Sequence, residues 1–221
     1  MKKTLKILLT GFEPFGGESI NPAFEILKTL PDTIDGHEII KREIPTSYKK
    51  SIEAIRSIFE EVRPDVTLSL GQAGGSFGLR VEKVALNLRD ANAPDNDGHR
   101  ASHEEIFEDG EIAYYSTLPV KAMVKELIKN NVPASLSYSA GSYVCNNVMY
   151  ALLYLGDKYY KDMRCGFIHV PYFPSQIIDK RNTFYMAPEE MTRGLLAAVR
   201  AITQNDADID FIVDGRKDGE A

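Results

Sequence analysis

The amino-acid sequence predicts an α/β fold: a single three-layer α/β/α domain around a central, largely parallel (mixed) twisted sheet. Apolar segments of strand length alternate along the chain with segments of helix length, an order typical of a parallel sheet covered by helices. With 221 residues, the chain has the length of one α/β domain and can bury roughly 70% of its unfolded surface. We expect one domain over residues 1–221, ending in a frayed tail over 206–221 that holds six acidic and two basic residues.

The N-terminal elements are indicated by an apolar run and by a helix-start signal. Residues 5–9 are typical of a buried strand, which ends at the glycine-rich loop 11–17. Asn21 is a favoured N-cap and Pro22 a favoured first helical residue, so a helix is expected over 23–30.

Periodicity predicts the next elements. Residues 37–44 favour a strand, and residues 48–62 favour a helix with its apolar side chains on one face. A strand over 65–70 leads into the glycine-rich turn 71–75, and the alternation of residues 81–88 is typical of a further strand.

The C-terminal half continues the alternation. The expected elements are a helix over 119–129, a strand over 134–138, a helix over 144–155, a strand over 164–170 and a last helix over 188–203. Before them, residues 89–111 form a polar, turn-rich segment, and a loop of that length usually has a function or is mobile.

Composition and charge exclude several classes of protein. The net charge of −6 and the pI near 5.3 argue against a nucleic-acid-binding protein, which normally has a basic face. Two cysteines are too few for a disulfide-rich secreted scaffold. No run approaches the roughly 18 apolar residues of a membrane span, and the short N-terminal run ends in a Gly/Pro turn instead of a signal-peptide cleavage site. We therefore expect a soluble, cytoplasmic protein without membrane or nucleic-acid partners.

The glycine-rich loop 11–17 follows a predicted strand and precedes a helix, where phosphate-binding loops lie. A P-loop needs Lys and Ser/Thr after its second glycine, but Gly17 and Glu18 stand there, and Glu18 would repel a phosphate. The dinucleotide-binding pattern is also missing. The aromatic pair Phe12 and Phe15 suits a flat, uncharged ligand, although both could equally be core residues.

Cys145 is the candidate nucleophile. It follows a predicted strand and a Ser/Gly turn, and with Ser142 as N-cap it would be the third residue of a helix. The free N–H groups and the positive dipole end found there favour a thiolate over a thiol. The alternative is a buried, inert thiol, which is common for unpaired cysteines. Cys165 lies inside a predicted strand, and we expect it to be structural.

A thiol nucleophile needs a base and a group that orients the base. His169 lies near the end of a predicted strand, and that edge of a parallel sheet holds ligands. Glu82 could orient its imidazole, or could instead pair with its neighbours Arg80 and Lys83. His169 could equally be a core residue with its hydrogen bonds satisfied.

His99 and His103 are four residues apart and on a helix could share a metal. They lie in a loop rich in Asp and Gly without an evident third ligand, so we expect no metal site.

The chain resembles the pyroglutamyl peptidase I family of cysteine peptidases over most of its length. Each shared motif is short, but their order and spacing together are highly specific. The motifs are Leu9-Thr-Gly-Phe-Glu-Pro-Phe-Gly-Gly17, Ile44-Pro-Thr46, Gly71-Gln-Ala-Gly-Gly75, Glu82-Lys-Val-Ala-Leu-Asn87, Ala93-Pro-Asp-Asn96, Ser116-Thr-Leu-Pro-Val120, Ser139-Ala-Gly-Ser-Tyr-Val-Cys-Asn146 and Gly166-Phe-Ile-His-Val-Pro171.

The resemblance implies one catalytic α/β/α domain that removes an N-terminal pyroglutamyl (5-oxoprolyl) residue from peptides through a thioester, with no metal or organic cofactor. The family's nucleophile, histidine and acid match Cys145, His169 and Glu82. Family members are commonly dimers or tetramers, so a homodimer or homotetramer is expected. The family's substrate pocket and the positions beside it match Phe12, Phe15, Thr46, Gln72, Tyr143 and Val144.

Three positions depart from the family pattern. Arg80 stands where members usually have Ser or Thr, Asn92 where many have Arg, and Tyr143 where Phe is frequent. The first two change the charge expected around Glu82. The alternatives to the implied activity are another thiol-dependent amidase or acyltransferase, and a ligand-binding homologue that no longer catalyses.

Overall fold

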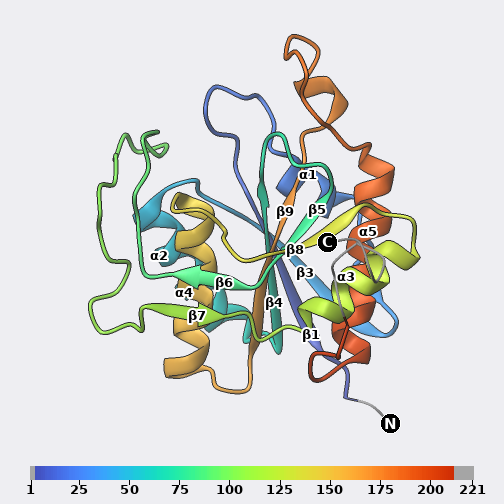
Figure 1. Ribbon diagram of the computed structural model, residues 1–221. Coiled ribbons are helices and arrows are strands. Elements are labelled where there is room, and N and C mark those ends of the chain that lie inside the picture. The colour runs from blue at the N-terminus through green and yellow to red at the C-terminus, as the bar shows by residue number, and fades with distance from the viewer. Residues whose placement is uncertain (1–2, 212–221) are drawn as a thin grey trace, which may run out of the picture.

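The structure, a computed structural model, describes residues 3–211 and has the α/β fold that the sequence predicts. Its main sheet consists of the strands β1 (Lys6–Phe12), β2 (Thr33–Ile34), β3 (His37–Ile44), β4 (Val66–Gln72), β5 (Leu79–Glu82), β8 (Ala134–Ser137) and β9 (Arg164–Val170). They form a seven-stranded sheet in the order β2-β3-β1-β4-β9-β5-β8. Figure 1 shows this sheet seen nearly edge-on between two layers of helices.

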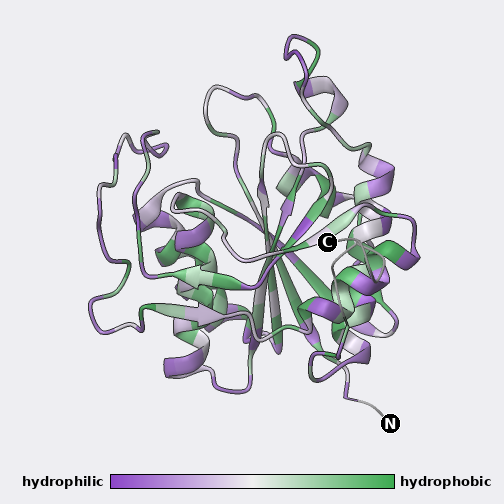
Figure 2. Ribbon diagram, viewed as in Figure 1, coloured by the Kyte–Doolittle hydropathy of each residue, from purple (hydrophilic) through white to green (hydrophobic). Residues whose placement is uncertain are grey.

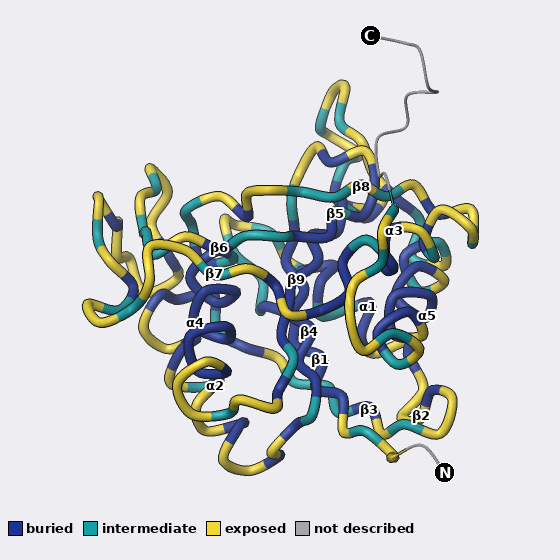
Figure 3. Tube along the Cα trace, turned by 60° about the horizontal axis from the view of Figure 1, so that its bottom comes forward, coloured by how far each residue is buried: buried dark blue, intermediate teal, exposed yellow. Residues whose placement is uncertain are grey.

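Helices cover both faces of the sheet. One layer contains α1 (Pro22–Lys28), α3 (Val120–Lys129) and α5 (Pro188–Gln204), and the other contains α2 (Tyr48–Val62) and α4 (Val144–Tyr159). A separate antiparallel pair, β6 (Val84–Leu86) and β7 (Ala113–Tyr115), lies against α4. The sheet thus separates two hydrophobic cores. Its central strands β1, β4 and β9 are buried over most of their length and are mainly apolar (Figures 2 and 3).

The strand directions place one edge of the sheet for ligand binding. β3, β1, β4 and β9 are parallel neighbours, whereas β5 runs antiparallel to β9. The carboxyl ends of the four parallel strands therefore meet at one edge, where α/β sheets hold their ligands.

Polar side chains bind the starts of α1, α2 and α3. Asn21 caps α1 by accepting the N–H of Ala23 at 3.0 Å, as its position before Pro22 predicts. The Ser47 hydroxyl caps α2 by accepting the N–H of Lys50. The start of α3 has no cap of its own, and Asp208 accepts the N–H of Lys121 there at 2.8 Å.

Part of the C-terminal tail that the sequence expects to fray contacts the folded domain. Asp208 accepts the N–H groups of Lys121 and Ala122 at the start of α3. The rest of the predicted tail, residues 212–221, lies outside the described residues.

The expected strand over residues 81–88 is two strands. β5 ends at Glu82 in the main sheet, and β6 begins at Val84 in the separate pair. Lys83 makes the turn between them: its N–H donates to the carbonyl of Ser137, and its carbonyl accepts the N–H of Ser116. No Gly or Pro marks this break, so the alternation of side chains runs through it unchanged.

The long segment 89–111 contains no helix or strand but is held firmly against the α2–α4 layer. Asp95 accepts the N–H of Tyr48 at the start of α2, and Arg89 donates to Asn147 on α4 at 2.7 Å. Phe107 stacks on Tyr154 with ring centroids 4.0 Å apart. Within residues 3–211 no helix is both long and apolar enough to cross a membrane.

Candidate active site

The imidazole of His169 and the carboxylate of Glu82 form a buried pair at the carboxyl edge of the sheet. His169 Nδ1 lies 2.7 Å from Glu82 Oε1, and the Glu82 side chain is completely buried. In the sheet register Arg80 is opposite His169 and Glu82 is opposite Phe167, so Glu82 and His169 project from the same face. This contact fixes the ring and leaves Nε2 as the nitrogen free to exchange a proton.

Cys145 lies on that same face, at the start of α4. The helix begins at Val144 with Tyr143 as N-cap, so Cys145 is the second helical residue and not the third, as it would be with Ser142 as cap. A Cβ built on Gly71 would lie only 2.7 Å from Cys145 Sγ. Gly71 is paired with His169 on the neighbouring strand, about 4.8 Å away in an ordinary sheet. The sulfur therefore lies beside the histidine, in space left open by a glycine.

The surroundings of Cys145 oppose ionisation, contrary to the prediction from its helix position. Burial raises the pKa of the thiol to about 12, and the nearby negative charge of Glu82 acts in the same direction. The backbone N–H of Cys145 lowers this pKa, but not enough to compensate. Desolvation thus acts against the first turn of the helix in setting this pKa, although the Cys145 side chain is partly exposed.

Of the three aromatic side chains predicted for the ligand pocket, Phe15 packs on Tyr143, whereas Phe12 packs on the core residue Phe167. Phe15 and Tyr143 have ring centroids 6.1 Å apart, and Phe12 packs on Phe167 at 6.4 Å. Phe12 is 2% exposed, whereas Phe15 and Tyr143 are partly exposed and form the accessible part of this group. The Tyr143 hydroxyl donates to the carbonyl of Pro94 at 2.9 Å, which attaches the aromatic group to the long loop.

The other three predicted pocket residues are placed differently. The Thr46 hydroxyl is already used, since it donates to the carbonyl of Glu13 at 3.0 Å. Val144 is fully buried in the core between the sheet and the α2–α4 layer, so only its backbone could face a ligand. Gln72 follows Gly71 in β4 and therefore projects from the opposite face of the sheet, where its Oε1 accepts from Gln176 at 2.8 Å.

Sequence reasoning missed two contributions to the site. Tyr48 packs edge-on against Tyr143 at 5.7 Å, and its buried hydroxyl has no hydrogen-bond partner among the described residues. Its apolar helix position marks it only as a core residue. The space above Gly71 was also missed, because the sequence does not show which face of a fully buried strand a residue occupies.

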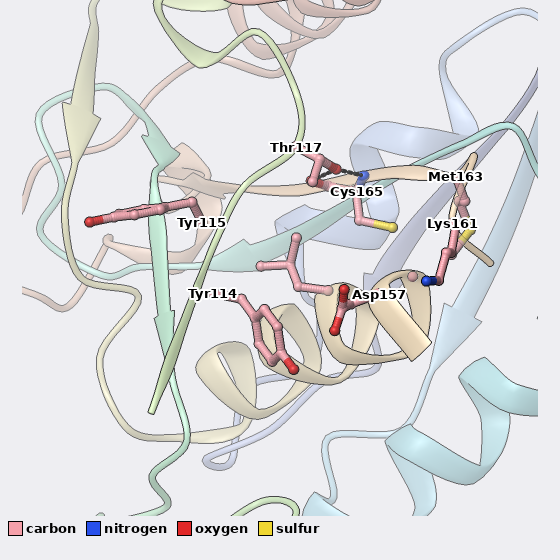
Figure 4. A pocket seen from close by; sticks show the side chains of 9 residues that line it. Tyr114, Tyr115, Thr117, Asp157, Lys161, Met163 and Cys165 are labelled. Carbon is pink, nitrogen blue, oxygen red and sulfur yellow. Dashed lines mark hydrogen bonds between the residues drawn. The ribbon is translucent and has the colours of Figure 1, made fainter. Parts of the chain in front are cut away.

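Cys165 lies apart from this site, at the opposite end of β9. It is 1% exposed, and burial raises the pKa of its thiol. Its sulfur points toward a separate pocket of about 290 Å³, where Tyr114, Asp157 and Lys161 are its neighbours (Figure 4). These features agree with the structural role predicted for Cys165.

His99 and His103 do not come together as metal ligands. His99 Nε2 bonds instead to Glu104 at 3.0 Å. Among the described residues no group of three or more His, Cys, Asp or Glu side chains has the arrangement of a metal site.

The fold and the site define a class of protein. A thiol at the start of a helix, next to a histidine oriented by a carboxylate, is the arrangement of a cysteine hydrolase. Here it lies at the ligand-binding edge of a three-layer α/β sheet.

Comparison with known proteins identifies the family within that class. The sequence profile of pyroglutamyl peptidase matches residues 5–205. The pyrrolidone-carboxylate peptidase of Clostridium perfringens is 54% identical over 205 residues, covering 93% of this chain and 96% of the relative. That of Thermosipho africanus is 50% identical over 198 residues, covering 90% and 97%.

Solved structures agree with the sequence comparison. The crystal structure of pyroglutamyl peptidase I from Bacillus amyloliquefaciens superimposes with a TM-score of 0.92 at 36% identity, covering 95% of this chain and all of that one. The pyrrolidone carboxyl peptidase of Thermococcus litoralis gives 0.88 at 37% identity, with 94% of this chain covered and 100% of the other. The chain belongs to the pyroglutamyl peptidase family.

Proposed function

We propose that the protein is a cysteine peptidase that hydrolyses the bond after an N-terminal pyroglutamyl residue of peptides. The observation that carries the proposal is the position of Cys145 Sγ above Gly71, beside a His169 held by Glu82, in a chain of this family. The assignment of Cys145, His169 and Glu82 as catalytic residues is part of the proposal.

In the proposed first step, Cys145 Sγ attacks the carbonyl carbon that joins the pyroglutamyl residue to the next residue. Because burial holds the thiol pKa near 12, the thiol proton passes to His169 Nε2 as the carbon–sulfur bond forms. Glu82, bound to Nδ1, stabilises the resulting imidazolium. In this scheme, backbone N–H groups of the first turn of α4, which have no intrahelical partners, bind the oxyanion.

In the second step, His169 protonates the leaving amine, and the acyl group remains on Cys145 as a thioester. A water molecule then attacks the thioester carbonyl and gives its proton to His169. The carbon–sulfur bond breaks, the thiol recovers its proton, and free pyroglutamate leaves. No cofactor takes part in this scheme.

The partly exposed aromatic pair, Phe15 and Tyr143, suits this substrate. A lactam ring is flat and neutral, whereas an ordinary N-terminus has an ammonium group that would need a carboxylate partner. Phe15 and Tyr143 supply apolar walls, and Tyr48, which packs against Tyr143, has a buried hydroxyl that no described residue binds. Peptides with an N-terminal pyroglutamate are therefore the proposed substrates, and a cytoplasmic homodimer or homotetramer is the proposed form of the enzyme.

A comparison of substrates tests the proposed activity. The same fluorogenic amine would be released from pyroglutamyl, prolyl and N-acetyl derivatives by the wild-type protein. We expect kcat/KM for the pyroglutamyl derivative to exceed that for the prolyl derivative by about 10³ or more, since a site built for the lactam leaves polar groups unpaired with proline. Equal rates on N-acetyl and pyroglutamyl derivatives would indicate a broader amidase, and no turnover would contradict the proposal.

A further inference from the structure

Arg80 is the cation that touches the buried histidine–carboxylate pair. Its Nη2 lies 3.2 Å from Glu82 Oε1, the same oxygen that contacts His169 Nδ1. The Arg80 side chain is 36% exposed, whereas that of Glu82 is completely buried. Two positive partners therefore compete for one oxygen when His169 is protonated.

The other oxygen of Glu82 makes this competition unusual. Oε2 is buried and has no hydrogen-bond partner among the described residues. The guanidinium has not formed the two-pronged contact that an arginine and a carboxylate favour. Instead, Arg80 Nη2 is also directed to the Ser137 hydroxyl at 3.2 Å and to the Ser139 carbonyl at 3.1 Å.

These serine contacts connect Arg80 to the nucleophile. Ser137 ends β8, and Ser139 lies in the turn that leads to Tyr143, the N-cap of α4. One guanidinium thus bridges the carboxylate behind His169 and the turn before Cys145. A Ser or Thr at this position would be too short to make the same bridge and would bring no charge.

Within residues 3–211, few ionisable groups face His169. On β5 these are Glu82 and Arg80, and on α4 the group is Cys145. The neighbouring strand β4 contributes Gly71 and Gln72, which do not titrate. On the far face of the sheet, the ionisable side chains of α1, Glu25 and Lys28, pair with each other at an exposed position.

We propose that Arg80 is a positioning residue that weakens the hold of Glu82 on protonated His169 and ties this pair to the turn before Cys145. The proposal rests on the proposed function. Because Arg80 interacts with the negative charge of Glu82 Oε1, less of that charge stabilises the imidazolium, and the neutral imidazole is favoured. The neutral imidazole is the form that accepts the proton of Cys145. Arg80 therefore extends activity toward acidic pH.

The test compares the pH profiles of kcat/KM for wild type, Arg80→Met, Arg80→Thr and Arg80→Lys with a pyroglutamyl substrate. Loss of the charge in the Met and Thr variants should move the acidic limb to higher pH by about 0.5 to 1 unit, as expected for a half-exposed charge. Arg80→Lys keeps the charge and should leave the limb within about 0.2 unit, while kcat falls because the shorter lysine side chain does not reach all three acceptors. Arg193→Met, which removes a half-exposed arginine of α5, is the control and should match wild type.

A second readout separates this inference from the proposed activity. The His169 ring protons would be titrated by NMR in a Cys145→Ala background, with and without Arg80→Met, where no turnover is needed. The titration should move to higher pH when Arg80 is replaced. An unchanged His169 titration would overturn the role given to Arg80. So would variants whose kcat/KM falls while the acidic limb of their pH profile stays at the wild-type pH. If the wild type fails to cleave any pyroglutamyl substrate, the proposed activity falls, and the NMR titration still decides the role of Arg80.

Discussion

At the scale of single residues, Cys145 is subject to opposing influences. The first turn of α4 offers an N–H group that favours a thiolate, while burial and the charge of Glu82 favour the thiol and raise its pKa to about 12. Desolvation acts on the whole sulfur, whereas one backbone N–H compensates only part of the lost hydration. In the proposed mechanism, His169 therefore removes the thiol proton as Cys145 attacks.

Alkylation of Cys145 by iodoacetamide tests this view in a Cys165→Ser background. Without the base, in His169→Ala, the rate should rise about tenfold per pH unit between about pH 7 and pH 10 without levelling off, because the thiol pKa lies near 12. The protein with His169 intact should react faster at neutral pH. A plateau near pH 9 in the His169→Ala variant would mean an ordinary thiol and would contradict the effect of burial.

At the scale of elements, α4 and β4 approach closely enough for the sulfur to occupy the place of a side chain at Gly71. A Cβ there would lie 2.7 Å from Cys145 Sγ and 2.8 Å from Phe167 Cζ, distances that real Cβ atoms do not reach. The backbone of Gly71 does not need a positive φ. Gly71 is required for space alone.

Gly71→Ala should therefore displace the sulfur. We expect kcat/KM to fall by about 10² or more, because small misplacement of a reacting group has large effects, together with a loss of stability of about 1–3 kcal/mol from overpacking. Gly166→Ala is a matched control: its Cβ would lie 2.6 Å from Leu118 on the other face of the sheet, away from the sulfur. The control should lose stability but keep its kcat/KM, as measured by thermal melts and turnover of folded protein. Equal activity in the two variants would contradict the role of Gly71.

The elements show what the sequence could predict. Periodicity gives β3, α2 and β9 with the observed bounds, because each has a clear pattern and a definite end. The break at Lys83 could not be predicted, since the alternation of side chains continues through it. The direction of Gln72 could not be predicted either: β4 is buried on both faces, so its sequence contains no polar face from which to read the alternation.

At the scale of the whole molecule, the candidate site is assembled from β5, α4 and β9, which are far apart in the sequence. The residues alone single out Cys145, His169 and Glu82 as candidates, each with a plain structural alternative. Only the resemblance to a family joins them before the fold is known. The sheet then brings the three together, because β5 lies beside β9 and α4 packs on the face from which Glu82 and His169 project.

The identity of the nucleophile is the central claim, and the turnover of Cys145→Ala tests it most directly. Release of a fluorogenic amine from its pyroglutamyl derivative should fall by at least about 10⁴-fold in folded Cys145→Ala, as expected when a catalytic nucleophile is removed. Cys165→Ser, measured beside it, should stay within about twofold of wild type. Substantial turnover in Cys145→Ala, or a loss confined to folded Cys165→Ser, would contradict the account.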